Sequence, residues 1–197
     1  MARALHYRDD VTCHAARIPE RAFTLIEMMI VVVIVGVLAA LAVVGYRKIV
    51  QTSHVSEATN TVQSIRVAQE AYHAETQQYA NISNDLQSSW YPQSAPVGSM
   101  VTAWGGPCTG CKSTTSWASL PLHIDGPVMF GYATVAGAST DSVPTALPAG
   151  MTVTLTQPTT DWFVVAAMCD IDGNGTPNTS VLTTSWSNQV ITSNEGQ

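Results

Sequence analysis

Charged side chains are scarce in this sequence. They make up 11% of its 197 residues, whereas apolar types reach 46%, and the formal net charge is −6. Of the eight Lys and Arg residues, four lie within residues 1–22. Because non-specific binding to nucleic acid depends on clustered basic side chains, this shortage argues against nucleic acid as a partner.

Catalytic signatures are absent as well. The sequence contains no GxSxG or HExxH pattern, and the histidines beyond residue 22, His54, His73 and His123, are scattered. Such a chain offers no recognisable arrangement of nucleophile and base, and no zinc motif. We therefore expect a protein that is not an enzyme and that needs no cofactor.

An ordinary secretory signal is missing too. Residues 1–22 are mixed in charge, and the apolar run follows them instead of lying within them. A signal peptidase cuts on the far side of the apolar segment, so this order predicts a different processing enzyme and retention of the apolar helix. We interpret residues 1–22 as a leader peptide that is removed.

The chain does have one long helical pattern. Residues 28–44 carry neither charge nor proline, and at a rise of about 1.5 Å per residue they nearly cross a hydrocarbon layer of about 30 Å. A buried helix of a soluble core would usually keep a polar stripe, which this segment lacks. We predict a transmembrane or filament-core helix over residues 23–50.

The helical pattern continues beyond this segment into more polar sequence. Side chains suited to a core recur every three or four residues at Val55, Ala58, Val62, Ile65, Gln69 and Tyr72. The opposite face is charged and polar, which is typical of a helix that lies on a globular core. We predict one continuous helix that ends near residue 77 and a globular head over residues 51–197.

The head is predicted to be α+β. Residues 80–126 are rich in Ser, Thr, Gly, Pro and Asn and show no period, which indicates a long irregular loop. Segments rich in Val, Thr and aromatic residues then predict antiparallel strands at 128–136, 151–157, 162–169 and 181–192. The fold class is thus a long hydrophobic helix that continues into a domain with a small antiparallel sheet at about 127–194.

Four aromatic residues of the irregular loop are Trp90, Tyr91, Trp104 and Trp117. They could form an adhesive surface or pin the loop to the core, and the second arrangement is more usual.

Residues 22–32, AFTLIEMMIVV, resemble the processing site of type IV prepilins and pseudopilins. The resemblance implies that a prepilin peptidase cuts between Ala22 and Phe23 and that Phe23, the new N-terminal residue, is N-methylated. Two positions depart from the usual pattern. Ala22 stands where most members have Gly, and Val44 stands where many pilins have a proline that loosens the helix.

The resemblance also implies a function. The chain would be a structural subunit of a type IV pilus, a major or minor pilin that supports surface attachment or twitching motility. Its partners would be copies of itself in a helical filament, other pilins, the prepilin peptidase, the inner-membrane assembly platform and the membrane. It would start as an inner-membrane precursor and end in a filament on the cell surface or in the periplasm. Two alternatives stay open: a type II secretion pseudopilin, and a membrane-tethered periplasmic binding module.

Glu27 stands out within the apolar segment. A lone carboxylate costs about 3 kcal/mol at the centre of a membrane helix and less near the interface, so it needs a partner. The resemblance implies that this partner is the free amine of Phe23 on a neighbouring subunit, and that small residues such as Gly36 let the helices approach closely. Without the flanking motif, a solvated carboxylate at the lipid interface would be the plainer interpretation.

The cysteines are Cys13, Cys108, Cys111 and Cys169, and removal of residues 1–22 leaves three. No second CxxC follows the first, so we favour a disulfide over a zinc or redox site. The bond could lie within the pair Cys108 and Cys111 or join one of them to Cys169.

Asp170, Asp172 and Asn174 place oxygen side chains at alternate positions next to glycines, as at the opening of a calcium loop. The closing Glu is missing, because the twelfth position is Val181. An EF-hand in its usual form is excluded. We favour an ordinary turn, with a smaller calcium site as the alternative.

Overall fold

The structure is a computed structural model in which residues 23–96, 98, 100–113 and 115–194 are described. The predicted leader, residues 1–22, lies outside them. The chain divides into two compact units, one up to Ala42 and one from Val43 onward. The division predicted at residue 50 stays a prediction.

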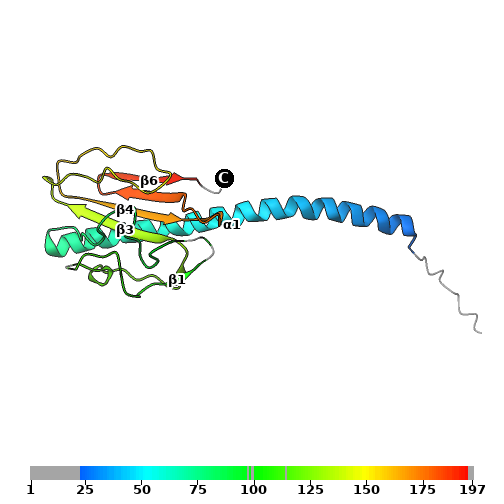
Figure 1. Cartoon of the computed structure of the whole chain (residues 1–197), viewed down its shortest axis with the longest axis horizontal. Coiled ribbons are helices and arrows are strands. Elements are labelled where there is room, and N and C mark those ends of the chain that lie inside the picture. The colour runs from blue at the N-terminus through cyan, green and yellow to red at the C-terminus, as the bar shows by residue number, and fades with distance from the viewer. Residues whose placement is uncertain (1–22, 97, 99, 114, 195–197) are drawn as a thin grey trace, which may run out of the picture. The chain divides into compact units, whose positions relative to one another are not determined.

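Helix α1 covers Leu25–Thr76, a length of 52 residues, which confirms the predicted continuous helix (Figure 1). No proline interrupts it, and hydroxyl groups such as that of Ser56 bond back to the carbonyl four residues earlier. The helix ends because Gln77 adopts a left-handed φ of 61° and donates its backbone N–H to His73 O at 2.8 Å.

One face of α1 is buried within the second unit. The buried residues recur every three or four positions, as predicted: Val55, Ala58, Thr61, Val62, Ile65, Ala68 and Gln69. Gln69 is the polar member of this face. Its amide nitrogen donates to Ala80 O at 2.8 Å and Thr134 Oγ1 at 3.0 Å, and its amide oxygen accepts from Ala80 N at 2.8 Å. Gln69 therefore ties the helix to the chain that leaves it.

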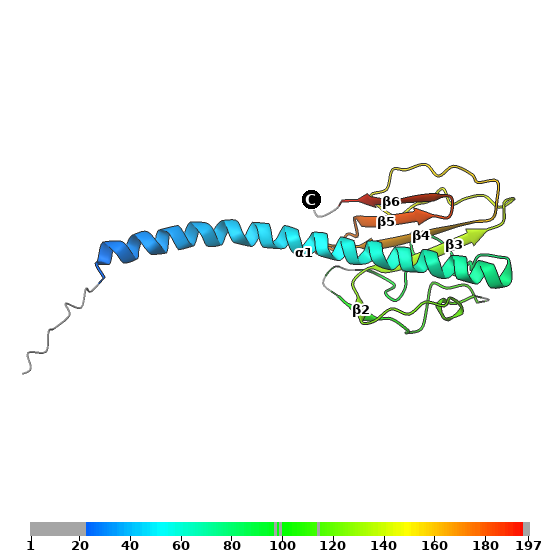
Figure 2. The same cartoon turned by 180° about the vertical axis from the view of Figure 1, so that it is seen from behind.

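The main sheet is an antiparallel meander with the order β3-β4-β5-β6. Its strands are β3 Gly131–Gly137, β4 Trp162–Cys169, β5 Thr179–Thr184 and β6 Ser187–Ser193. Figures 1 and 2 show these strands running along the part of α1 that belongs to the same unit. A small second sheet pairs β1, Thr102–Ala103, with β2, Pro127–Val128, and a 3-10 turn, η1, spans Trp117–Ser119. The predicted α+β fold is confirmed.

Both faces of the main sheet are covered. Along β4 the side chains of Phe163 and Val165 join the cluster that contains the helix, whereas Val164 and Ala166 join a second cluster on the opposite face. The connection between β3 and β4 covers that second face with half-buried Val143, Leu147, Met151 and Leu155. As a result, every residue of β4 is buried.

Three of the predicted strands are wrong. The predicted strand 128–136 joins the end of β2 to most of β3, although these two strands belong to different sheets. Residues 151–157 are described, yet none of them lies in a strand. Their alternation of apolar and polar side chains arises because Met151 and Leu155 pack on the second face of the sheet without joining its hydrogen-bond ladder. The predicted strand 181–192 is in fact the two strands β5 and β6, joined by a turn at Ser185 and Trp186.

The irregular loop closes the edge of β3. Tyr91 and Tyr132 exchange both backbone hydrogen bonds, at 2.9 and 2.7 Å, and Ser83 N donates to Thr134 O at 2.9 Å. The buried ring of Tyr91 stacks on that of Trp117, with 5.5 Å between ring centroids. These aromatic residues therefore pin the loop to the core, which was the more usual of the two arrangements.

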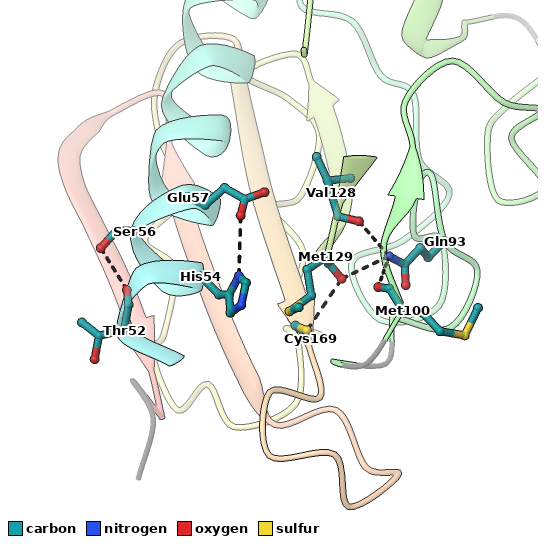
Figure 3. A network of polar contacts seen from close by, with 9 residues as sticks. All are labelled: Thr52, His54, Ser56, Glu57, Gln93, Met100, Val128, Met129 and Cys169. Atoms are coloured by element: carbon teal, nitrogen blue, oxygen red, sulfur yellow. Dashed lines mark hydrogen bonds and ion pairs between the residues drawn. The ribbon is translucent and has the colours of Figure 1, made fainter. Parts of the chain in front are cut away.

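Gln93 fastens the middle of this loop. Its side-chain nitrogen donates to the carbonyls of Met100, Val128 and Met129, each at 3.1 Å (Figure 3). The two protons of this buried amide are shared among the three carbonyls, and the contacts hold the middle of the loop against the residues that follow it.

Replacing Gln69 with Met should lower the free energy of unfolding by about 2–4 kcal/mol, because the buried partners at Ala80 and Thr134 would lose their hydrogen bonds. Chemical unfolding of the full chain in detergent, followed by tryptophan fluorescence, measures this change. Gln63→Met on the same helix is the control, since Gln63 is half-exposed and its side chain makes no hydrogen bond within the described part of the chain. Equal stability of the two variants would contradict the assignment.

Candidate functional site

Thr24 and Glu27 bind one another at the start of α1. Glu27 Oε2 accepts hydrogen bonds from Thr24 N at 2.8 Å and from Thr24 Oγ1 at 2.7 Å, while Glu27 N donates to Thr24 Oγ1 at 3.2 Å. This reciprocal arrangement is a capping box, which satisfies backbone groups that a helix start leaves free. Thr24 is not among the predicted site residues, although the Thr-x-x-Glu spacing is the recognised signal of such a cap.

The cap determines how the Glu27 carboxylate is presented. Oε2 takes both of the bonds from Thr24, and Oε1 has no hydrogen-bond partner among the residues that the structure describes. Both side chains are exposed. One carboxylate oxygen is thus held in place at the helix end, and the other is free to accept a cationic donor.

The first part of α1 presents its apolar side chains outward on every side. All described residues from Phe23 to Ile49 are exposed, including large side chains such as Leu25, Ile30 and Leu38. In length and composition α1 is suited to crossing a membrane, and it is the single helix of that kind in the described part of the chain. The absence of a polar face agrees with the sequence pattern.

Gly36 lies in open space. A Cβ atom built on it would meet no atom within 4 Å. No contact within the described chain therefore requires a glycine at this position. In a helix interior Gly costs about 1 kcal/mol relative to Ala, so its presence calls for a reason outside the single chain.

The disulfide joins Cys108 to Cys111, with 5.5 Å between the Cα atoms. Of the pairings that the sequence left open, the structure selects the one within the CxxC pair. Cys169 is a free, buried thiol whose Sγ lies 3.7 Å from Met129 O (Figure 3). Burial, with the nearby carboxylates of Asp170 and Glu57, raises the pKa of the Cys169 thiol to about 12.

The residues considered for calcium form a loop held by its own hydrogen bonds. Buried Asp170 accepts backbone N–H groups through both oxygens: Oδ1 from Gly173 and Asn174, and Oδ2 from Gly175. Hydrogen bonds with Asp170, with the backbone of Asn174 and with the side chain of Asn178 lower the pKa of Asp172. A calcium ion at Asp170 would have to displace N–H donors. The smaller calcium site stays the untested alternative to the favoured turn.

The N-terminal segment of the chain is similar to a known processing motif. Residues 18–43 match the family model of the prokaryotic N-terminal methylation motif. This range contains the proposed cleavage position as well as Glu27 and Gly36. The resemblance to type IV prepilins that residues 22–32 carry is confirmed for this part of the chain.

Two curated relatives then give particular likenesses. The chain is 39% identical over 66 residues to the type IV major pilin protein PilA of Myxococcus xanthus (strain DK1622), a match that covers 34% of this chain and 30% of the relative. It is 41% identical over 56 residues to the fimbrial protein EcpC of Eikenella corrodens, which covers 28% of this chain and 37% of that relative. The chain thus spans about a third of the length of the curated relatives it matches. No solved structure matches it.

Cys169 should resist N-ethylmaleimide in the folded protein at neutral pH and react once the chain is unfolded in guanidinium chloride. The reason is that the buried thiol is neutral, and the thiolate is the form that attacks the reagent. Peptide mass spectrometry reads the label at each cysteine. Cys108 and Cys111 are internal controls, since they should react only after reduction. Rapid labelling of Cys169 in the folded chain would contradict its burial.

Proposed function

We propose that this chain is a structural subunit of a type IV pilus. The observation that carries the proposal is an uncovered apolar helix that begins with a capped, negatively charged Glu27 inside a prokaryotic N-terminal methylation motif. The two relatives are named as a pilin and a fimbrial protein, which favours a pilus over a type II secretion pseudopilus. A tethered binding module would require only an apolar anchor, without Glu27.

In this proposal the precursor is inserted in the inner membrane through α1, and a prepilin peptidase removes residues 1–22. Cleavage between Ala22 and Phe23 creates a free amine on Phe23, which is then N-methylated. Ala22 lies outside the described residues. Phe23 immediately precedes the Thr24 cap, so cleavage places the new amine next to the start of the helix.

Assembly would bring that amine to the Glu27 carboxylate of a neighbouring copy. Glu27 Oε1, which has no partner within the described chain, would accept the amine while Oε2 stays on Thr24. Pairing the two charges in an apolar surrounding removes the cost of leaving either one alone and fixes the axial register between subunits.

The rest of the helix would replace lipid by other helices. A bundle of identical apolar helices offers side chains as apolar as lipid, so a subunit can leave the membrane at little net cost. Gly36 would permit a close approach of neighbouring helices, which gives its open position a function. The assembly platform of the inner membrane and other pilins would take part, and the filament would serve surface attachment or twitching motility.

Glu27→Gln tests the charge apart from the cap. Glutamine at this position preserves a capping box, so the helix should start unchanged, but it cannot form an ion pair with an amine. We expect the variant precursor to accumulate in the membrane while sheared filaments fall below detection by immunoblot. Glu75→Gln, an exposed substitution at the other end of α1, is the control and should assemble normally. Filaments of Glu27→Gln in normal amounts would refute the pairing.

Gly36→Leu tests helix packing between copies. Within one chain the larger side chain meets open space and should favour the helix by about 0.8 kcal/mol. Filament yield should nevertheless drop sharply, because the side chain would hold neighbouring helices apart. Val37→Leu, a change of one methylene at the next position, should assemble as the wild type does. Normal filaments from Gly36→Leu would show that the close approach does not involve this residue.

A further inference from the structure

The connection between β4 and β5 displays an exposed asparagine on a well-defined loop. Buried Asp170 anchors the loop through three backbone N–H groups, at 3.0 Å from Gly173, 3.2 Å from Asn174 and 2.6 Å from Gly175. Gly173 and Gly175 have φ values of +72° and +88°, which other residues rarely adopt. Asn174 lies between them and is exposed, as is Thr176.

Asn174, Gly175 and Thr176 form an Asn-x-Thr sequence, the acceptor pattern of N-linked glycosylation. Thr176 N donates to Asn174 Oδ1 at 2.8 Å, which fixes the orientation of the side-chain amide. Asn174 Nδ2 in turn donates to Asp172 Oδ2 at 2.9 Å. A carboxylate therefore accepts a proton of the same nitrogen that would bond to a sugar.

Two further Asn-x-Ser sequences in the chain provide a comparison, at Asn81 and at Asn178. The hydroxyl residue of the first, Ser83, is buried and accepts Thr134 N at 3.1 Å. The hydroxyl residue of the second, Ser180, is buried in β5 and donates to Ala149 O at 2.6 Å. Both serines are already engaged inside the fold, so Asn174 is the one of the three whose whole acceptor sequence an enzyme can reach.

We propose that Asn174 is a glycosylation site that receives an oligosaccharide from a polyprenyl-pyrophosphate carrier. The Asn174 Nδ2 atom forms a bond to C1 of the first sugar, the bond between C1 and the pyrophosphate oxygen breaks, and the polyprenyl pyrophosphate leaves. The amide proton passes to a carboxylate base. This inference rests on the proposed function in one respect, which is that the head lies outside the cytoplasm where such carriers present their sugars.

The same Asn-Gly sequence has a competing chemistry, in which Gly175 N attacks the Asn174 side-chain carbonyl and ammonia is lost. Here Gly175 N donates to Asp170 Oδ2 at 2.6 Å, so the attacking nitrogen is already engaged. This hydrogen bond restrains the attacking nitrogen within the loop, which should slow the loss of ammonia.

The test uses the full protein purified from the cells that make it, with peptide mass spectrometry over the three Asn-x-Ser/Thr sequences. We expect a sugar-bearing peptide at Asn174 and unmodified peptides at Asn81 and Asn178. Asn174→Gln should lose the sugar mass, whereas the matched control Asn178→Gln should keep it. Thr176→Ser should retain the sugar and Thr176→Ala should lose it. Comparing these two variants distinguishes loss of the acceptor hydroxyl from failure of the loop to form.

An unmodified or deamidated Asn174 would overturn the proposal, and so would sugar at Asn81 or Asn178 in comparable amounts. The same spectra read the N-terminal residue of the chain. A chain that starts at Phe23 but carries no sugar would contradict only the proposed glycosylation site. A sugar-bearing chain that still starts at Met1 would contradict only the proposed function as a pilus subunit, so the two failures are distinguishable.

Discussion

Eighteen large apolar side chains between Phe23 and Ile49 are exposed in the single chain, and seventeen of them lie on helix α1. Fully burying one such side chain is worth about 1.5–3 kcal/mol, and these are 44–77% exposed, so together they represent on the order of 20 kcal/mol. The net stability of a whole folded domain is about 5–15 kcal/mol. Water is therefore excluded as the permanent surrounding of this segment. A lipid bilayer and a bundle of sister helices are the two surroundings that fit, and in the proposed function the subunit would pass from the first to the second.

Within the second unit, by contrast, the same helix is one layer of a hydrophobic core that it shares with the sheet. The antiparallel sheet has one face on the helix and the other under the connection from β3 to β4, so β4 is buried throughout. The side-chain amides of Gln69 and Gln93 donate hydrogen bonds to backbone carbonyls where the helix, the loop and the sheet meet.

The features set by local sequence were predictable, and those set by tertiary packing were not. The helix follows from an unbroken apolar run and a 3.6-residue period. The role of Glu27 in assembly was inferred from its motif and stays a prediction. The segment 151–157 alternates like a strand because it packs on a sheet face, which periodicity cannot distinguish from pairing. The turn at Ser185 and Trp186 has no Gly or Asn to mark it. The Thr24 cap was predictable from the Thr-x-x-Glu spacing, but only Glu27 was predicted as a site residue because the processing motif assigns a role to it alone.

The most direct measurement of the central claim is the intact mass and N-terminal sequence of this protein in filaments sheared from cells. The account predicts a chain that begins at Phe23 and carries a methyl group on its amine. Recovery of the protein only from membranes, with residues 1–22 still attached, would contradict it.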